Sequence, residues 1–285
     1  MGTPGLARVP PVILPPNVTA RTWSPAPETW SDDPRWIGEW MMIDGEQWFA
    51  RIARGTDPSL PPVVMVHGLI VSGAYFRPVA NAMDPRHTIY VPDLPGIGRT
   101  NSPTSWTLPL WTAHLAGWMD AHQLTGAIVV GNSLGCQIAT LLATTRPDLV
   151  RSLILIAPTL DPAITTVRQV LWRGIKDIPH ERPSIWTVWI PDFFKTGIRH
   201  SLAMMREMFR DDQGRLGDVT QSALVIGGEL DPIVTPNWVR EMAFRIPRGE
   251  AIIVPGAPHA LNYSSPHHLV EAIGRAIAQG MLPAS

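Results

Sequence analysis

Cysteine and charged residues are both scarce in this sequence. A single thiol, Cys136, occurs in 285 residues, so neither an internal disulfide framework nor a cysteine-rich zinc site can form. Charged residues make up 16%, with 23 basic side chains against 24 acidic ones. This balance disfavours nucleic-acid binding, which needs a surplus of lysine and arginine to neutralise phosphates. Disorder is also disfavoured, because 45% of the residues are apolar and the net charge is close to zero.

Long uninterrupted apolar segments are missing as well. No stretch approaches the roughly 18 consecutive apolar residues of a bilayer-spanning helix, so we expect no membrane span. The first twenty residues contain no continuous apolar stretch of signal-peptide length, and prolines interrupt them. We therefore expect a cytoplasmic protein, long enough to bury roughly 75% of its unfolded surface.

Proline, by contrast, is abundant. The chain has 30 prolines, and those between residues 10 and 34 prevent a regular helix or a central strand there. The same segment carries apolar side chains that a solvated tail would lack, namely Val12, Ile13, Leu14, Trp23 and Trp30. We expect residues 1–35 to form an irregular arm that lies along the body of the protein.

The residues that follow have the pattern of a mostly parallel α/β sheet. Two apolar segments, 36–43 and 46–53, flank Asp44-Gly45, a dipeptide favoured in tight hairpin turns. Beyond them, short apolar runs alternate with segments of helical spacing, which is typical of a parallel sheet covered by helices on both faces. The expected strands are 62–66, 87–91, 127–130, 152–157, 223–226 and 251–254, and the expected helices are 75–83, 108–124, 134–145, 236–246 and 266–279.

Residues 160–217 interrupt this alternation. They contain no strand-like run and are rich in tryptophan, methionine and phenylalanine, so we interpret them as a helical cap inserted into a core formed by residues 36–159 and 218–285. Most apolar side chains of such a cap pack onto the core, and the remainder are expected to line a pocket between cap and sheet. The candidate substrate contacts are Ser72, Trp186, Trp189, Phe193 and Met205. The basic residues of the segment are most simply a solvated face.

The strongest catalytic signal lies between the strand at 127–130 and the helix at 134–145. Residues 131–135 read Gly-Asn-Ser-Leu-Gly, which matches the nucleophile elbow G-x-S-x-G in the strand–helix context that this motif requires. So short a pattern also arises by chance, but its context favours the catalytic interpretation. Ser133 would then stand exposed above the sheet, with the N–H of Leu134 directed at a developing oxyanion.

A serine nucleophile needs a base, and the base in turn needs an orienting acid. His259 follows the last expected strand, as the order Ser…Asp…His requires. Its competitors, His267 and His268, fall at the start of a helix behind a proline. We expect the activity to rise through the ordinary histidine pKa of about 6.5.

Asp231 is the candidate acid, because it follows the penultimate expected strand. A carboxylate there would accept a hydrogen bond from the histidine Nδ1–H and stabilise the imidazolium. Glu229 and Asp161 are competing candidates, and any of the three could instead serve a turn or cap a helix.

The loop after the strand at 62–66 is expected to complete the oxyanion hole. Its Leu69 N–H is the candidate second donor, and Gly68 allows the backbone to approach the reacting centre. His67 is interpreted as a loop-orienting residue and Cys136 as a buried, inert packing residue. Ser72 could bond within its own loop or touch substrate.

Taken together, the ordered motifs resemble the α/β-hydrolase superfamily, in its capped branch with a serine nucleophile. They are His-Gly at 67–68, Asp-Leu-Pro-Gly-Ile-Gly at 93–98, the elbow, Gly-Glu-Leu-Asp at 228–231 and Gly-Ala-Pro-His at 256–259. The resemblance covers about residues 60–280. It implies a mostly parallel eight-stranded sheet with a cap after the sixth strand, a serine triad, and no metal or organic cofactor.

By position, the resemblance makes Ser133 the nucleophile, Asp231 the acid and His259 the base, with Leu69 and Leu134 forming the oxyanion hole. Asp93 would be a structural turn residue. Serine at the elbow argues against the dehalogenase and epoxide-hydrolase branches, whose nucleophile is a carboxylate. A Gly-Asn-Ser elbow also occurs in the carbon–carbon hydrolases of ring-cleavage products, although those usually have tryptophan after the catalytic histidine, where this chain has alanine.

The expected function is cleavage of an apolar carboxylic ester or lactone through an acyl-enzyme, by a monomer or homodimer. The alternatives are a carbon–carbon hydrolase on the same triad and a non-catalytic binding protein with a hydrolase fold, because fold alone does not determine reaction.

Overall fold

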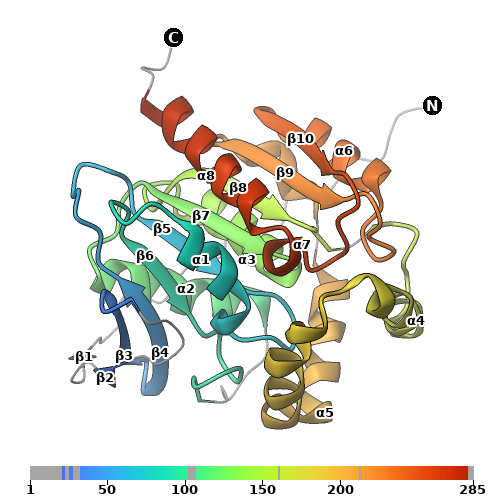
Figure 1. The fold of residues 1–285 in the computed structure, drawn as a ribbon, viewed down its shortest axis with the longest axis horizontal. Helices are drawn as coiled ribbons and strands as arrows, with labels where there is room; N and C mark the ends of the chain where they lie inside the picture. The colour runs from blue at the N-terminus through green and yellow to red at the C-terminus, as the bar shows by residue number, and fades with distance from the viewer. Residues whose placement is uncertain are drawn as a thin grey trace.

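The computed structural model describes residues 21–22, 26–27, 33–101, 107–159, 161–211 and 213–281. Its strands form one sheet (Figure 1) in the order β1-β3-β4-β6-β5-β7-β8-β9-β10, and β2 also pairs with β3. In this order, each strand from β6 to β10 runs parallel to the strand beside it. Strand β4 pairs antiparallel with both β3 and β6. The main strands are β3 (Trp36–Ile43), β4 (Glu46–Ala53), β5 (Val63–Val66), β6 (Ile89–Pro92), β7 (Ala127–Asn132), β8 (Val150–Ile156), β9 (Ser222–Gly228) and β10 (Gly249–Val254).

The predicted hairpin is formed by β3 and β4. Asp44 and Gly45 both have positive φ, 47° and 81°, which is the conformation of a type I′ turn and explains the Asp-Gly dipeptide. Two short strands, β1 (Arg21–Thr22) and β2 (Ala26–Pro27), pair antiparallel with β3. The other residues of the predicted arm lie outside the described residues, except those from 33 onward.

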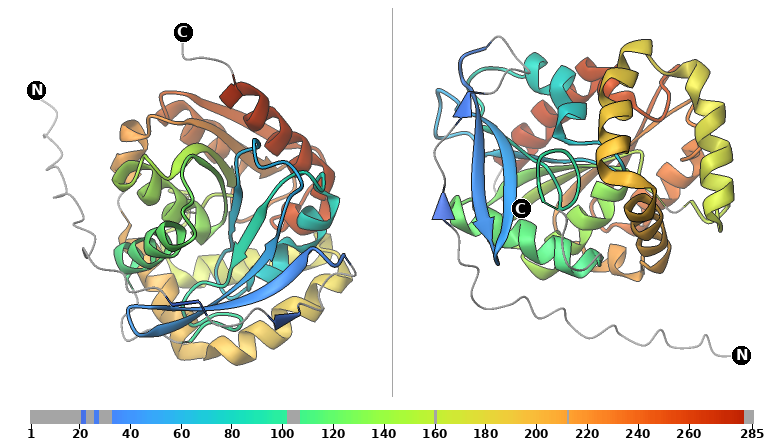
Figure 2. Two further views of the ribbon diagram at one scale, coloured as in Figure 1. Left: turned by 90° about the vertical axis from the view of Figure 1, so that its left-hand side faces the viewer. Right: turned by 90° about the horizontal axis from the view of Figure 1, so that it is seen from below.

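Helices cover both faces of the sheet (Figure 2), as the uninterrupted burial of strands such as β5 and β7 requires. On one face α1 contacts α8, and on the other α2 contacts α3 while α6 packs on β9 and β10. The helices of the core are α1 (Arg77–Ala82), α2 (Leu108–Ala121), α3 (Leu134–Thr145), α6 (Pro236–Arg245), α7 (Leu261–Ser264) and α8 (Pro266–Met281), and the 3₁₀ turn η1 (Gly73–Phe76) precedes α1.

A helical insertion follows β8, the sixth of the eight main strands, and precedes β9. It contains α4 (Val167–Asp177), the 3₁₀ turns η2 (Ile178–His180) and η3 (Pro183–Ile185), α5 (Trp186–Arg210) and η4 (Gln213–Asp218). In Figure 1 the helices α4 and α5 project beyond the sheet at the lower right. In the part of the chain that the structure describes, no helix is long and apolar enough to cross a bilayer.

The predicted fold class is therefore confirmed, with one adjustment and some omissions, among them the short strands β1 and β2 within the arm that was expected to be irregular. The helix expected at 75–83 is divided into η1 and α1. The single-turn helix α7 was not predicted, because it is too short to show a periodic pattern.

Candidate active site

Ser133 occupies a strained turn between β7 and α3. Its backbone has φ 52° and ψ −116°, a conformation that costs a non-glycine residue of the order of 1–3 kcal/mol and is found mainly at functional sites. The Ser133 N–H donates to the carbonyl of Ile156 on the neighbouring strand β8. The serine is therefore held at the carboxyl edge of the sheet.

The glycines of the elbow are required by close backbone approach. A Cβ at Gly131 would lie 2.6 Å from the carbonyl oxygen of Gly135, and a Cβ at Gly135 would clash with the carbonyl oxygen of Val66. Only glycine avoids these contacts. The G-x-S-x-G spacing thus follows from the packing of α3 against β5 and β7.

The loop after β5 lies directly beside Ser133. A Cβ at Gly68 would be 3.0 Å from the Cβ of Ser133. The N–H of the next residue, Leu69, donates no hydrogen bond to another described residue. Leu134 is the first residue of α3, so its N–H has no partner within the helix. The two predicted oxyanion-hole donors are thus on segments that flank the serine.

His67 orients this loop as an uncharged ring. Its Nε2 accepts the N–H of Leu94 at 2.8 Å, and its Nδ1 lies 3.0 Å from the carbonyl oxygen of Gly68, which fixes the proton on Nδ1. Burial, opposed by the charge of Asp93, lowers the His67 pKa to about 4. The neutral histidine therefore braces the backbone and is too weakly basic to act as a base at neutral pH.

Asp231 and His259 form a buried pair on the loops that follow β9 and β10. The His259 Nδ1 lies 2.8 Å from the Asp231 Oδ2, while the other carboxylate oxygen, Oδ1, accepts the N–H groups of Ile233 and Val234 at 2.7 and 2.9 Å. The aspartate is thus fixed by its own loop. It holds the imidazole with Nε2 free to face a reacting group.

The competing acids have other hydrogen-bond partners, and the competing histidines are exposed to solvent. Glu229 accepts the N–H of Gly256 on the surface, and Asp161 accepts hydrogen bonds from Thr235. His267 and His268 are exposed in the first turn of α8. Among the candidate acids and candidate histidines, Asp231 and His259 are therefore the two whose side chains contact each other.

A buried amide pair joins the serine segment to the histidine segment. The Nδ2 of Asn132 donates to the Oδ1 of Asn262 at 3.2 Å, and the Nδ2 of Asn262 donates to the carbonyl of Tyr75. Asn262 is completely buried. Sequence reasoning missed its contact with Asn132, because nothing in the local pattern around 262 indicates a partner 130 residues away.

Two buried carboxyl groups of the insertion contact the backbone around His259. Asp177, at the end of α4, accepts the N–H of His259 at 3.3 Å, and Glu181 accepts the N–H of Ala260 at 2.6 Å. Their remaining oxygens are buried and receive no hydrogen bond from any other described residue, and one proton shared between the two carboxyl groups would join them by a hydrogen bond. Sequence reasoning missed this pair, although acidic residues four positions apart in so apolar a segment were an available signal.

These carboxyl groups change the titration expected of the site. Burial raises the pKa of Glu181 to about 8, helped by the hydrogen bond and the charge of Asp177, and burial also raises the pKa of Asp177. For His259, burial acts to lower the pKa, but the carboxylate of Asp231, followed by Asp177 and Glu181, outweighs it and raises the pKa to about 9. The ordinary value of about 6.5 expected from sequence is therefore corrected upward.

An apolar cavity of about 310 Å³ opens beside the loop after β5. Three of the predicted substrate contacts line it, namely Trp186, Trp189 and Phe193 on α5, and Leu69 lines its opposite wall. Trp186 and Trp189 pack edge to face with ring centroids 5.3 Å apart. Ser72 and Met205 are buried but do not line this cavity.

Two other residues singled out in the sequence, Asp93 and Cys136, are buried in the core. Asp93 is completely buried and accepts hydrogen bonds from Arg51 and from the N–H groups of Gly73 and Arg99. Cys136 is completely buried, and burial raises its thiol pKa, so it remains protonated. Within the described ranges, no three histidine, cysteine, aspartate or glutamate side chains are arranged to hold a metal ion.

The parallel sheet, the strained serine elbow and the acid–histidine pair on the following loops define the α/β-hydrolase class of protein. A family model described as "Alpha/beta hydrolase family" matches residues 63–273. The chain therefore belongs to the alpha/beta hydrolase family.

Individual relatives within this family act on different substrates. The chain is 32% identical over 127 residues to the 2-hydroxy-6-oxo-2,4-heptadienoate hydrolase of Pseudomonas putida, a match that spans 42% of this chain and 46% of that protein. It is 26% identical over 246 residues to the pimeloyl-[acyl-carrier protein] methyl ester esterase of Xanthomonas campestris, spanning 76% of this chain and 95% of that one.

Solved structures agree with the fold. An E-2-(acetamidomethylene)succinate hydrolase superposes with a TM-score of 0.71 at 22% identity, covering 85% of this chain and 99% of that one. The enol-lactonase of Burkholderia xenovorans superposes with a TM-score of 0.70 at 18% identity, covering 84% and 99%. At these identities the likeness establishes the fold alone.

Proposed function

We propose that this protein is a serine hydrolase that cleaves a carboxylic ester or lactone of an apolar substrate through an acyl-enzyme intermediate. The observation that carries the proposal is the strained Ser133 elbow at the sheet edge where the Asp231–His259 pair also lies. A strained serine backbone of this kind is characteristic of a nucleophile elbow.

In the proposed mechanism, His259 Nε2 accepts the hydroxyl proton as Ser133 Oγ attacks the substrate carbonyl carbon. The N–H groups of Leu69 and Leu134 stabilise the oxyanion that forms. Imidazolium then donates the proton to the leaving alcohol, and the acyl group remains on Ser133. Water, deprotonated by His259, attacks the acyl-enzyme and releases the acid with the serine restored.

The apolar cavity supports the proposal that the substrate has an apolar acyl or alcohol group. Leu69, a proposed oxyanion-hole residue, lines this cavity together with aromatic residues of α5, which supports an apolar binding site beside the reacting carbonyl group. Such a lining offers no charged partner for a polar substrate, so ester specificity would come from apolar contact.

A panel of p-nitrophenyl esters of increasing acyl length tests this function. The wild-type protein is expected to hydrolyse them with a preference for medium or long chains, and Ser133→Ala is expected to lose about 10⁴-fold or more in kcat. Full activity in Ser133→Ala would refute the assignment.

Carbon–carbon bond hydrolysis is the second candidate, favoured by the partial match to the heptadienoate hydrolase and by Asn132 in the elbow. A vinylogous diketone assayed beside the esters separates the two reactions. Faster turnover of the diketone than of every ester would assign the second one.

A further inference from the structure

The helical insertion turns apolar side chains outward, where the surface of a globular protein is normally polar. On α4 and η2, Leu171, Trp172, Ile175 and Ile178 are between 40% and 58% exposed and follow one side of the helix. The described residues expose eleven large apolar side chains, and nine of them belong to the insertion. The other five of the nine are on α5: Ile190, Phe193, Phe194, Ile198 and Leu202. An apolar area of this kind marks an interaction surface.

Between residues 161 and 211 the exposed charges are all positive, whereas Asp218 at the end of η4 is exposed and acidic. Between residues 161 and 211, the acidic side chains are buried or half-buried, and they are Asp161, Asp177, Glu181, Asp192, Glu207 and Asp211. The exposed charged side chains are Arg168, Lys176, Arg182, Lys195, Arg199, Arg206 and Arg210. Apart from Arg210, which approaches Glu207, none of these cations has an ion-pair partner among the described residues. The exposed surface of residues 161–211 is therefore cationic in a chain whose net charge is −1.

The buried carboxylates explain how this separation of charge arises. Asp192 accepts the N–H of Ser72, and Glu207 accepts the N–H of Leu108, just as Asp177 and Glu181 accept N–H groups near His259. The acidic residues are used to attach the insertion to the core. The basic residues are left for the outer face.

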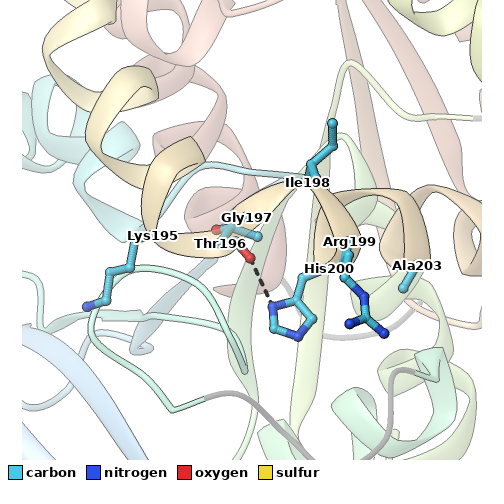
Figure 3. Close-up of a pocket in the computed structure, with 7 residues that line it drawn as sticks. All are labelled: Lys195, Thr196, Gly197, Ile198, Arg199, His200 and Ala203. Atoms are coloured by element: carbon cyan, nitrogen blue, oxygen red, sulfur yellow. Dashed lines mark hydrogen bonds between the residues drawn. The ribbon is translucent and has the colours of Figure 1, made fainter.

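A hollow of about 700 Å³ lies where α5 bends at Gly197, whose φ is 73°. Figure 3 shows Lys195 on one side of the bend and Arg199 with His200 on the other. The Thr196 hydroxyl in its wall is buried and has no hydrogen-bond partner among the described residues. Cations around a hollow of this size fit an anionic headgroup.

We propose that the outer face of α4 and α5 docks onto the surface of an anionic phospholipid bilayer. Tryptophan, phenylalanine and aliphatic side chains would enter the interface, and lysine and arginine would contact lipid phosphates. Lys176 already lies over the Trp172 ring, with its Nζ 5.3 Å from the ring centroid. This places a cation and an aromatic group together on the docking face.

Charge favours a lipid surface over a second copy of the chain. Two copies joined through this face would bring their unpaired cations against one another, and such like-charge contact is unfavourable. An anionic bilayer instead neutralises them. Ile190, Phe193 and Phe194 also line the apolar cavity, so the docked face would open that cavity toward molecules dissolved in the bilayer.

Vesicle flotation of the full chain tests the proposal independently of catalysis, because Ser133→Ala is expected to bind as the wild type does. The protein should float with vesicles of phosphatidylcholine and phosphatidylglycerol in equal parts, but not with phosphatidylcholine alone. Added salt should weaken this binding. Lys176→Glu should lower the partition coefficient by about fivefold per unit of charge removed, and the double variant Trp172→Ser/Ile175→Ser by about tenfold or more.

Matched controls lie on α6, away from α5 in Figure 1: Phe244, which is 87% exposed, and Arg248 just after the helix. Phe244→Ser and Arg248→Glu should float like the wild type, and unfolding temperatures confirm that all variants are folded. Absence of flotation, equal flotation with both kinds of vesicle, or unchanged flotation of the α4 variants would overturn the proposal. A dimer in sedimentation that Trp172→Ser/Ile175→Ser abolishes would assign the face to a second copy instead.

Discussion

The carboxylate of Asp231 lies 2.8 Å from the Nδ1 of His259, and both side chains are buried although they come from loops after different strands. In the proposed mechanism this contact fixes the histidine tautomer and stabilises the imidazolium. Asp231→Asn should therefore reduce kcat for an ester by about 10⁴-fold.

Glu229 provides the matched control for that prediction, because it is an exposed acid in the same loop. Glu229→Gln should keep kcat close to the wild-type value. Equal losses in the two variants would contradict the role given to Asp231, and thermal unfolding of both would show whether the loop is intact.

The pH dependence of kcat/KM follows from the raised pKa of His259. The base must be neutral to accept the serine proton, so kcat/KM should rise with pH through a value near 9. Asp177→Asn removes a negative charge that favours imidazolium, and should move this midpoint down toward 6.5. A midpoint that stays in place in Asp177→Asn would show that this carboxyl group does not act on the histidine.

The raised pKa of Glu181 predicts that the stability of the folded protein depends on pH. Its carboxyl pKa is raised from 4.5 to about 8 on folding, so in this interval the folded state holds a proton that the unfolded state releases. The free energy of unfolding should therefore fall as the pH rises through the interval. His259 acts in the same direction between 6.5 and about 9.

Glu181→Gln keeps an oxygen that can accept the Ala260 N–H but cannot titrate. Its unfolding temperature, measured at a series of pH values, should lose the decline between 4.5 and about 6.5 that the wild type shows. Parallel curves for the two proteins would mean that Glu181 is not protonated in the folded state.

Trp189 lines the apolar cavity, and we therefore expect it to contribute to selectivity for the acyl-chain length of the ester. Trp189→Ala should raise KM for long-acyl esters by about 10-fold or more, since a large buried contact is lost, while KM for acetyl esters should change little. Phe244→Ala, which removes an exposed aromatic on α6, should change neither. An equal rise for short and long esters would place the acyl chain elsewhere.

The sequence was sufficient to predict the fold, and it also yields three candidate triad residues, because the signals for both are local. Asp44-Gly45 identifies a turn that needs two positive φ values, and the glycines around Ser133 identify a turn with no room for side chains. The order of the strands then places Asp231 and His259 at the same edge as Ser133.

The roles of Asp177, Glu181 and Asn262 could not be predicted, because each depends on how distant segments pack. The spacing of Leu171 and Ile175 indicates an apolar stripe, but not that the stripe faces away from the core. Composition likewise suggested a solvated basic face, without showing that the acidic side chains between residues 161 and 211 are buried or half-buried. These features arise when the insertion docks on the core.

In the proposed mechanism Ser133 is a nucleophile activated by His259. Labelling with a fluorophosphonate probe, followed by mass spectrometry of the modified peptide, tests it most directly. We expect stoichiometric modification of Ser133 in the wild type, none at that position in Ser133→Ala, and strongly slowed labelling in His259→Ala. A folded wild-type protein that leaves Ser133 unmodified would contradict this mechanism and favour a non-catalytic binding role.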